Sequence, residues 1–286
     1  MTEWPLVLFT VAIQLSCGLA MAAVFADFKG VRPAAMRPVG TAIFPLAAVG
    51  LLVSLFHLGR PLAGFKALRN LGRSPLSLEV LMTLLFAVLA LAYSHLWRKE
   101  IKPGRAALGL VTSICGLGAV ISSSAIYRLP SQPVWNSGWL PVSFLGTTLL
   151  LGGFASVTLV KLKDDPRLLR IYLAAGGAGS LVVVFSAMWM VASLSRGTNN
   201  AFVSARLQHA LHLLGSPWYS GSFGLHLLLT AVVPIAFAYR SWPGKEVSAQ
   251  SAATPTALML GFIAIMVGVL FGRTILYSLG LSMPPF

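Results

Sequence analysis

The sequence has few charged residues, and very few of these are acidic. Only 10% of its 286 residues are charged, whereas roughly 25% is usual in a soluble domain. Seven residues are Asp or Glu and 21 are Lys or Arg, and the mean hydropathy is +0.82. This composition excludes an ordinary soluble protein. In an apolar chain the net charge of +14 reflects membrane topology and anionic lipid headgroups, so no nucleic-acid partner is expected.

Cysteine is also scarce, which bears on bound redox centres. Cys17 and Cys115 lie in separate apolar runs, and the sequence has no CxxC motif and no Cys/His cluster. Iron–sulfur clusters and structural zinc sites need grouped thiolates or imidazoles. The sequence therefore predicts no iron–sulfur cluster or zinc site. No metal or haem of its own is expected, since the histidines are also poorly placed as a pair of haem ligands.

Long apolar runs take the place of the missing charge. A helix of about 20 apolar residues crosses the hydrocarbon core of a membrane, and eight windows meet this requirement. They cover roughly residues 5–26, 39–58, 77–96, 106–126, 140–160, 171–194, 223–239 and 256–276. The predicted fold class is an all-α integral membrane protein, a bundle of eight transmembrane helices forming one domain over residues 1–286. The seventh window is the shortest and contains Pro234, and a short surface helix is predicted at Ala201–Leu214.

Basic residues are divided unevenly between the two sides that these helices define. Thirteen lie in connections on one side and eight on the other. Basic loops stay in the cytoplasm, so the larger group is assigned to the cytoplasm and both termini to the outside. The eight outer residues are Arg60, Lys66, Arg69, Arg73, Arg128, Arg196, Arg206 and Arg273.

Half of this outer charge lies in one stretch, FHLGRPLAGFKALRNLGRSPLSLE at 56–79. His57 is expected at the end of the second helix and Glu79 at the start of the third. Glu79 is the only acid well inside an apolar segment, and such ionisable residues are functional candidates by default. Between them, apolar and basic residues recur at helical spacing, which predicts a short amphipathic helix in the interface that ends at Gly72.

Other polar residues are predicted at the same outer face, and each has a simpler explanation than function. They are Glu3, Trp4, Tyr127, Arg128, His226, Arg273 and Tyr277. The tyrosines and arginines can be ordinary interfacial anchors whose long side chains reach the headgroups. His57 can close a helix C-terminus and Glu79 can stabilise a helix N-terminus. A histidine and an acid paired across one connection are harder to explain in this way.

Five segments match the pattern of a known family in the right order. They are EWPLVLFT at 3–10, FHLGRPLAGFKAL at 56–68, SPLSLE at 74–79, PVWNS at 133–137 and FGRTILYSLGL at 271–281. Together with the eight-helix count, the sequence resembles the membrane anchor subunit (C subunit, DmsC-type) of the bacterial dimethyl sulfoxide reductase family over nearly its whole length. It departs from the family pattern at Leu78, Val269 and Gly280, where Asn, an acid and His are common.

The resemblance implies a three-subunit complex of anaerobic respiration in the bacterial inner (cytoplasmic) membrane. An anchor of this kind binds menaquinol as its substrate and passes the electrons to an iron–sulfur subunit. That subunit delivers them to a molybdopterin catalytic subunit, which reduces the terminal acceptor. His57 and Glu79 match the family positions associated with the quinol site.

The chemistry of quinol oxidation fits these residue types, because two protons must leave with the two electrons. His57 can accept a hydrogen bond from a quinol hydroxyl, and Glu79 can take the second proton or relay it outward. Arg60 can hold a negatively charged headgroup or a lipid phosphate. The other predicted headgroup contacts are Tyr127, Arg273 and Tyr277. The basic helix that joins His57 to Glu79 is the predicted docking surface for an acidic partner, or alternatively a face for lipid headgroups.

Three other functions remain compatible with the sequence. A b-type haem anchor needs paired histidines at matched depth, and only His57 and His226 share a face. A transporter keeps polar groups near the middle of the membrane, where this sequence offers little beyond Gln14 and Ser122–Ser124. A purely structural tether needs neither His57 nor Glu79.

Overall fold

The computed structural model describes residues 4–31, 33–56, 61–160, 166–196, 198–240 and 254–281. In this part of the protein, eight helical spans are long and apolar enough to cross a membrane, and no strand is present. The helices are α1 (Trp4–Phe28), α2 (Pro33–Ser54), η1 (Pro61–Asn70), α3 (Pro75–Arg98), α4 (Arg105–Ala125), α5 (Trp139–Leu159), α6 (Pro166–Leu194), α7 (Ala201–Gly215), α8 (Pro217–Leu227), η3 (Leu228–Val232), α9 (Val233–Arg240) and α11 (Pro255–Leu281).

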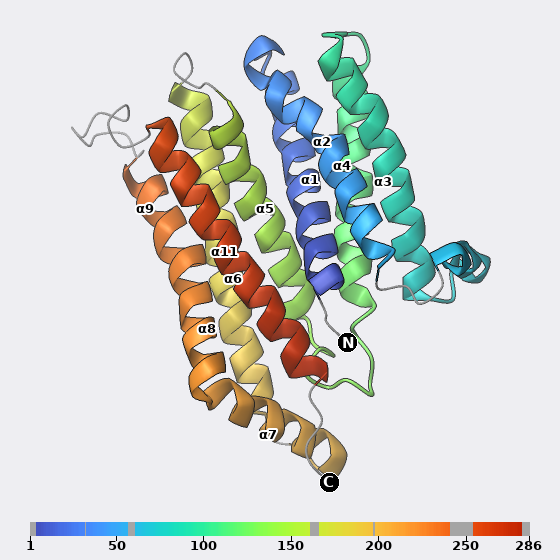
Figure 1. Ribbon diagram of the computed structural model, residues 1–286, viewed down its shortest axis with the longest axis vertical. Coiled ribbons are helices and arrows are strands. Elements are labelled where there is room, and N and C mark those ends of the chain that lie inside the picture. The colour runs from blue at the N-terminus through green and yellow to red at the C-terminus, as the bar shows by residue number, and fades with distance from the viewer. Residues whose placement is uncertain are drawn as a thin grey trace.

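The spans alternate in direction, so α1 begins and α11 ends at the same end of the bundle (Figure 1). We call this end, which also carries η1 and α7, end A, and the opposite end, B. The predicted helical fold with eight spans and a surface helix at α7 is confirmed. The predicted amphipathic helix is also present as η1, but it is a 3₁₀ helix rather than an α-helix, and Gly72 follows it with a φ of +80°.

The seventh span is longer than predicted and is interrupted. It runs from Pro217 to Arg240 as α8, a π-helical segment η3 and α9. Pro234 has no N–H to donate to the carbonyl of Thr230, one turn earlier. The Ser180 hydroxyl of α6 donates to that carbonyl instead, at 2.6 Å. The irregular turn therefore keeps its carbonyl hydrogen-bonded inside the bundle, as an apolar environment requires.

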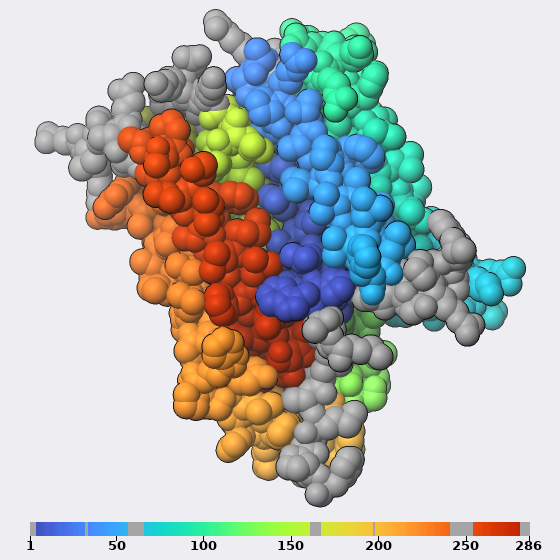
Figure 2. All heavy atoms as spheres, viewed as in Figure 1, coloured from blue at the N-terminus to red at the C-terminus, as the bar shows by residue number. Residues whose placement is uncertain are grey.

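Two groups of helices pack side by side. Helices α1–α4 form one group, and α5, α6, α8–α9 and α11 form the other. Helix α1 is the most buried span and joins the groups by packing on α5, and Figure 2 shows only a narrow strip of it between α2 and α11. Gly18 and Gly152 make this approach possible, because a Cβ on Gly18 would lie 2.6 Å from the Gly152 Cα.

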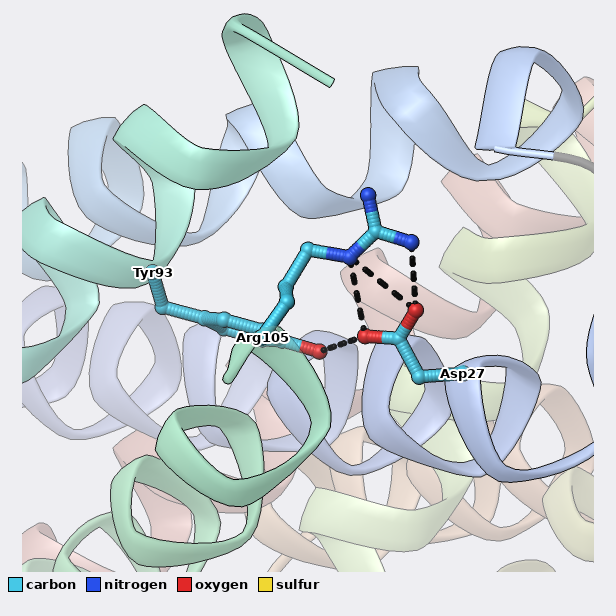
Figure 3. Close-up of polar contacts among 3 residues, drawn as sticks. All are labelled: Asp27, Tyr93 and Arg105. Atoms are coloured by element: carbon cyan, nitrogen blue, oxygen red, sulfur yellow. Dashed lines mark hydrogen bonds and ion pairs between the residues drawn. The ribbon is translucent and has the colours of Figure 1, made fainter. Parts of the chain in front are cut away.

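A buried ion pair ties the first group together at end B (Figure 3). The Arg105 guanidinium donates to both carboxylate oxygens of Asp27, with a shortest distance of 2.6 Å, and the Tyr93 hydroxyl donates to Oδ2 at 3.2 Å. Arg105 also stacks on the Trp97 ring at 3.7 Å. These contacts link α1, α3 and α4, and they hold a charged pair in a site closed to solvent.

Candidate functional site

Glu79 lies in α3 at end A, and its carboxylate is turned toward α4. It is half-buried, and its Oε1 accepts a hydrogen bond from the Ser123 hydroxyl at 2.5 Å. Ser123 is in the last turn of α4, so the serines at 122–124 lie toward end A rather than in the middle of the membrane, where their sequence position suggested them. His57 and Arg60 lie outside the described residues, so the predicted His57–Glu79 pairing stays a prediction.

Three aromatic residues close the bundle next to Glu79. The rings of Tyr127, Trp135 and Tyr277 contact one another with centroid distances of 5.1 to 6.3 Å, and the Tyr127 hydroxyl donates to that of Tyr277 at 3.3 Å. The Trp135 indole donates to the Leu276 carbonyl at 2.8 Å. It lies so close to Gly280 that a Cβ there would overlap the indole ring. Trp135 thus occupies the space that a side chain at position 280 would need.

Arg273 lies one turn deeper in α11 and is almost completely buried, with 3% of its surface exposed. Its guanidinium donates to Gln14 of α1 at 2.8 Å and to Thr147 of α5 at 3.2 Å, and it stacks on Phe144 at 3.9 Å. No carboxylate among the described residues forms an ion pair with it. A buried cation without a counter-ion is costly, which marks this as a place where negative charge or a polar ligand is favoured.

The structure therefore excludes the interfacial-anchor explanation for three of the predicted residues. Tyr127, Arg273 and Tyr277 are buried between helices, and only Arg128 is exposed as an anchor would be. Burial raises the pKa of Tyr127 well above its usual value, and the neighbouring Tyr277 and the Glu79 carboxylate raise it further. The charge of Glu79 therefore acts on Tyr127, which lies one helical turn beyond Ser123, the hydrogen-bond partner of Glu79.

Four of the six predicted site residues are thus brought into one group, and we call Glu79, Ser123, Tyr127, Tyr277 and Arg273 the polar cluster. It joins α3, α4 and α11 at end A, and the Tyr277 hydroxyl extends it to Thr10 of α1 at 3.4 Å. Sequence reasoning missed Gln14 and Thr147 as partners of Arg273. The signal was present, since each is a polar residue in a strongly apolar run.

His226 is placed differently from the expectation that it opens the seventh span. It lies nine residues into that span, and its Nδ1 is 2.8 Å from the Gly268 carbonyl of α11. The ring lies against the backbone at Gly272, where a Cβ would be 2.5 Å from the imidazole. His226 and Arg273 line a common internal cavity of about 30 Å³. The mechanism predicted from the sequence did not include His226. Its contacts are with α11, and the sequence does not show how α8 and α11 pack together.

The polar cluster offers hydrogen-bond donors, acceptors and a buried cation. Among the described residues, no group of three or more His, Cys, Asp or Glu side chains is placed to hold a metal ion. An acid, hydroxyls and aromatic rings within an apolar bundle suit an amphiphilic aromatic molecule with hydroxyl groups.

The fold and this cluster define a multi-pass helical membrane protein with a polar site near one membrane face. Comparison with known proteins gives the family. The protein belongs to the DMSO reductase anchor subunit (DmsC) family, whose model matches residues 1–279.

Individual relatives agree with this assignment over most of their length. The sequence is 29% identical over 288 residues to the C subunit of anaerobic dimethyl sulfoxide reductase of Escherichia coli (strain K12), an alignment that covers 98% of this protein and 96% of that one. It is 25% identical over 294 residues to the YnfH subunit of an anaerobic dimethyl sulfoxide reductase of the same strain, with 98% and 95% covered. It is also 25% identical over 237 residues to the C subunit of the anaerobic dimethyl sulfoxide reductase of Haemophilus influenzae (strain ATCC 51907 / DSM 11121 / KW20 / Rd), with 81% and 82% covered.

Proposed function

We propose that this anchor binds menaquinol at the polar cluster and oxidises it, passing the electrons to an iron–sulfur partner subunit that supplies a molybdopterin catalytic subunit. Family membership supports the anchor role. The main support for a quinol site is that four polar residues meet at one end of the bundle. They come from α3, the turn after α4, and α11: Glu79, Tyr127, Tyr277 and Arg273.

Four residues of the cluster have a task in this proposal. The Glu79 carboxylate accepts a proton from a quinol hydroxyl, directly or through His57. Tyr127 and Tyr277 orient the headgroup with their hydroxyls and ring edges. Arg273 stabilises the negative charge that develops on the headgroup oxygen as its proton leaves. The apolar faces of the surrounding helices accommodate the isoprenoid tail.

We infer the orientation of the protein from its basic residues, because thirteen lie in the connections at end B and eight at end A, and the more basic side stays in the cytoplasm. At end A the described basic side chains outside the bundle core are Lys66, Arg69, Arg73, Arg128 and Arg196, and all are exposed. Glu79 is the only described acid at that end, and it lies within the cluster. We place end A outside the bacterial inner membrane, where its basic surface, η1 included, receives an acidic face of the iron–sulfur partner.

The test compares two Glu→Gln variants in the assembled three-subunit complex. Glu79→Gln removes the proton acceptor with little change in shape and is expected to lower quinol-dependent reduction of dimethyl sulfoxide by about 100-fold. Glu100→Gln is the matched control, because Glu100 is exposed at end B and pairs with the exposed Arg37; normal turnover is expected. Reduction of the same acceptor by a viologen dye, which bypasses the anchor, should be unchanged in both and reports assembly.

A Glu79→Gln complex that oxidises quinol at the wild-type rate would refute the assignment. His57→Ala is expected to abolish quinol-dependent turnover while the complex still assembles. A complex whose quinol oxidation survives that change would show that His57 has no role in the reaction.

A further inference from the structure

Two cavities lie one after the other along α6 at end A. The outer one is bounded by residues 130–137, the end of α6 and α7, and the inner one by α5, α6, α8 and α11, including Arg273 of the polar cluster. The outer one has a volume of about 410 Å³ and includes exposed Asn136 and Arg196 in its lining. The inner one, about 30 Å³, ends at His226 and Arg273. A water molecule needs about 10–15 Å³ of such volume, so the inner cavity has room for about two.

The residues of α6 that line the two cavities lie on one face of that helix. On α6, Ser193 lines the outer cavity and Met190, Ala187 and Ser186 line the inner one, which is the spacing of a single helical face. Ser137 and Ser193 both line the outer cavity, and their hydroxyls lie 3.4 Å apart. Ser193 is one helical turn from Met190, which lines the inner cavity, so this hydroxyl pair lies on the side of the outer cavity that faces the inner one.

The inner end of the path presents an acceptor beside a cation. The Nδ1 of His226 bonds to the Gly268 carbonyl, so a neutral imidazole carries its proton there and leaves the Nε2 lone pair free. Among the described residues, no group donates to Nε2. Arg273 also lines this cavity. It donates hydrogen bonds to Gln14 and to Thr147, and Thr147 is itself a lining residue.

We propose that these cavities form one hydrated path that carries protons between the polar cluster and the aqueous phase at end A, with His226 Nε2 as its inner proton acceptor. The role rests on the proposed function. Oxidising a quinol turns two C–OH groups into C=O, releasing two electrons to the iron–sulfur partner and two protons. Glu79 receives one proton, and His226 Nε2 receives the other through water in the inner cavity and passes it outward past the Ser137–Ser193 hydroxyl pair.

The path itself is tested by the chemical accessibility of single cysteines in a background where Cys17 and Cys115 are replaced by Ala. Ala187→Cys places a thiol on the inner cavity, and Leu140→Cys places one nearer the surface of end A, on α5, away from both cavities. A membrane-impermeant charged thiol reagent, applied to the folded complex, should label Ala187→Cys several-fold faster. Equal or slower labelling would overturn the path, whatever the complex does with quinol.

The role in turnover is tested with one substitution at two positions of α6. Ala187→Leu fills the inner cavity, whereas Ala192→Leu adds the same side chain at an exposed position. Ala187→Leu and His226→Gln are each expected to slow quinol-dependent turnover about tenfold, with viologen-dependent activity intact and Ala192→Leu normal. Normal turnover in both the Ala187→Leu and His226→Gln complexes would overturn the role. A wild-type complex that oxidises no quinol would refute the proposed function and leave the labelling result in place.

Discussion

Replacing Asp27 by Asn tests the buried ion pair at end B. The Arg105 and Asp27 side chains are 4% and 7% exposed, so water cannot compensate Arg105 when its carboxylate partner is removed. Breaking a buried pair from one side costs about 3–5 kcal/mol. The substituted amide keeps one oxygen that can accept from the guanidinium, so we expect the lower end, about 3 kcal/mol, or roughly a hundredfold in the folding equilibrium constant.

The assay is reversible unfolding of the purified protein in mixed detergent micelles, followed by the loss of helical circular dichroism. Glu100→Gln is the matched control, because it breaks the pair with Arg37, whose side chains are about half exposed. Exposed pairs contribute roughly 0–1 kcal/mol, so that variant should unfold close to the wild type.

A double variant separates the loss of the pair from the loss of shape. Asp27→Asn combined with Arg105→Met leaves no buried charge behind, so much of the lost stability should return. The reasoning is refuted if Asp27→Asn costs no more than Glu100→Gln. It is refuted equally if the double variant is less stable than Asp27→Asn alone, since the cost would then come from packing rather than from the unpaired cation.

Two further variants test how the helices are held together. Gly18→Ala should destabilise the bundle strongly, by several kcal/mol for an overpacked contact, because its Cβ would press on the α5 backbone at Gly152; Gly215→Ala, which meets no neighbour, should have little effect in the same unfolding assay. Equal stability of the two variants would show that α1 and α5 can separate without cost. Ser180→Ala should cost about 1–3 kcal/mol, because the Thr230 carbonyl loses its donor in an apolar environment. An unfolding midpoint unchanged by Ser180→Ala would mean that another donor reaches that carbonyl.

Much of the architecture could be predicted because a membrane-spanning helix can be recognised from consecutive residues in the sequence. About 20 consecutive apolar residues suffice to specify a span, so all eight were found, and α7 and η1 were found from spacing. The limits of the seventh span were missed at its start, where Pro217, Trp218 and Tyr219 resemble a loop in sequence but open a helix. The Thr230 carbonyl, which Pro234 leaves without its helical donor, accepts from Ser180 of α6 instead. The spacing of residues within one helix cannot show such a contact between helices.

The candidate site was predicted only in part, for a physical reason. Glu79 stood out by itself, because an acid in an apolar run is costly wherever it lies. Arg273 and Tyr277 also stood out, but the sequence did not decide between a lipid-facing anchor and a buried group. That choice depends on how α11 is rotated against α1 and α5, and the contacts with Gln14 and Thr147 settle it.

The sequence alone determined the class of the protein, its number of spans and the acid in its third span, because each depends on the chemistry of neighbouring residues along the chain. Only the tertiary structure decided that Tyr127, Tyr277 and Arg273 face inward beside Glu79 and that His226 shares a cavity with Arg273. These arrangements join residues up to 267 positions apart, as in the Tyr277–Thr10 contact. Such contacts depend on helix rotation and close glycine packing, and neither is encoded in the periodicity of any one helix.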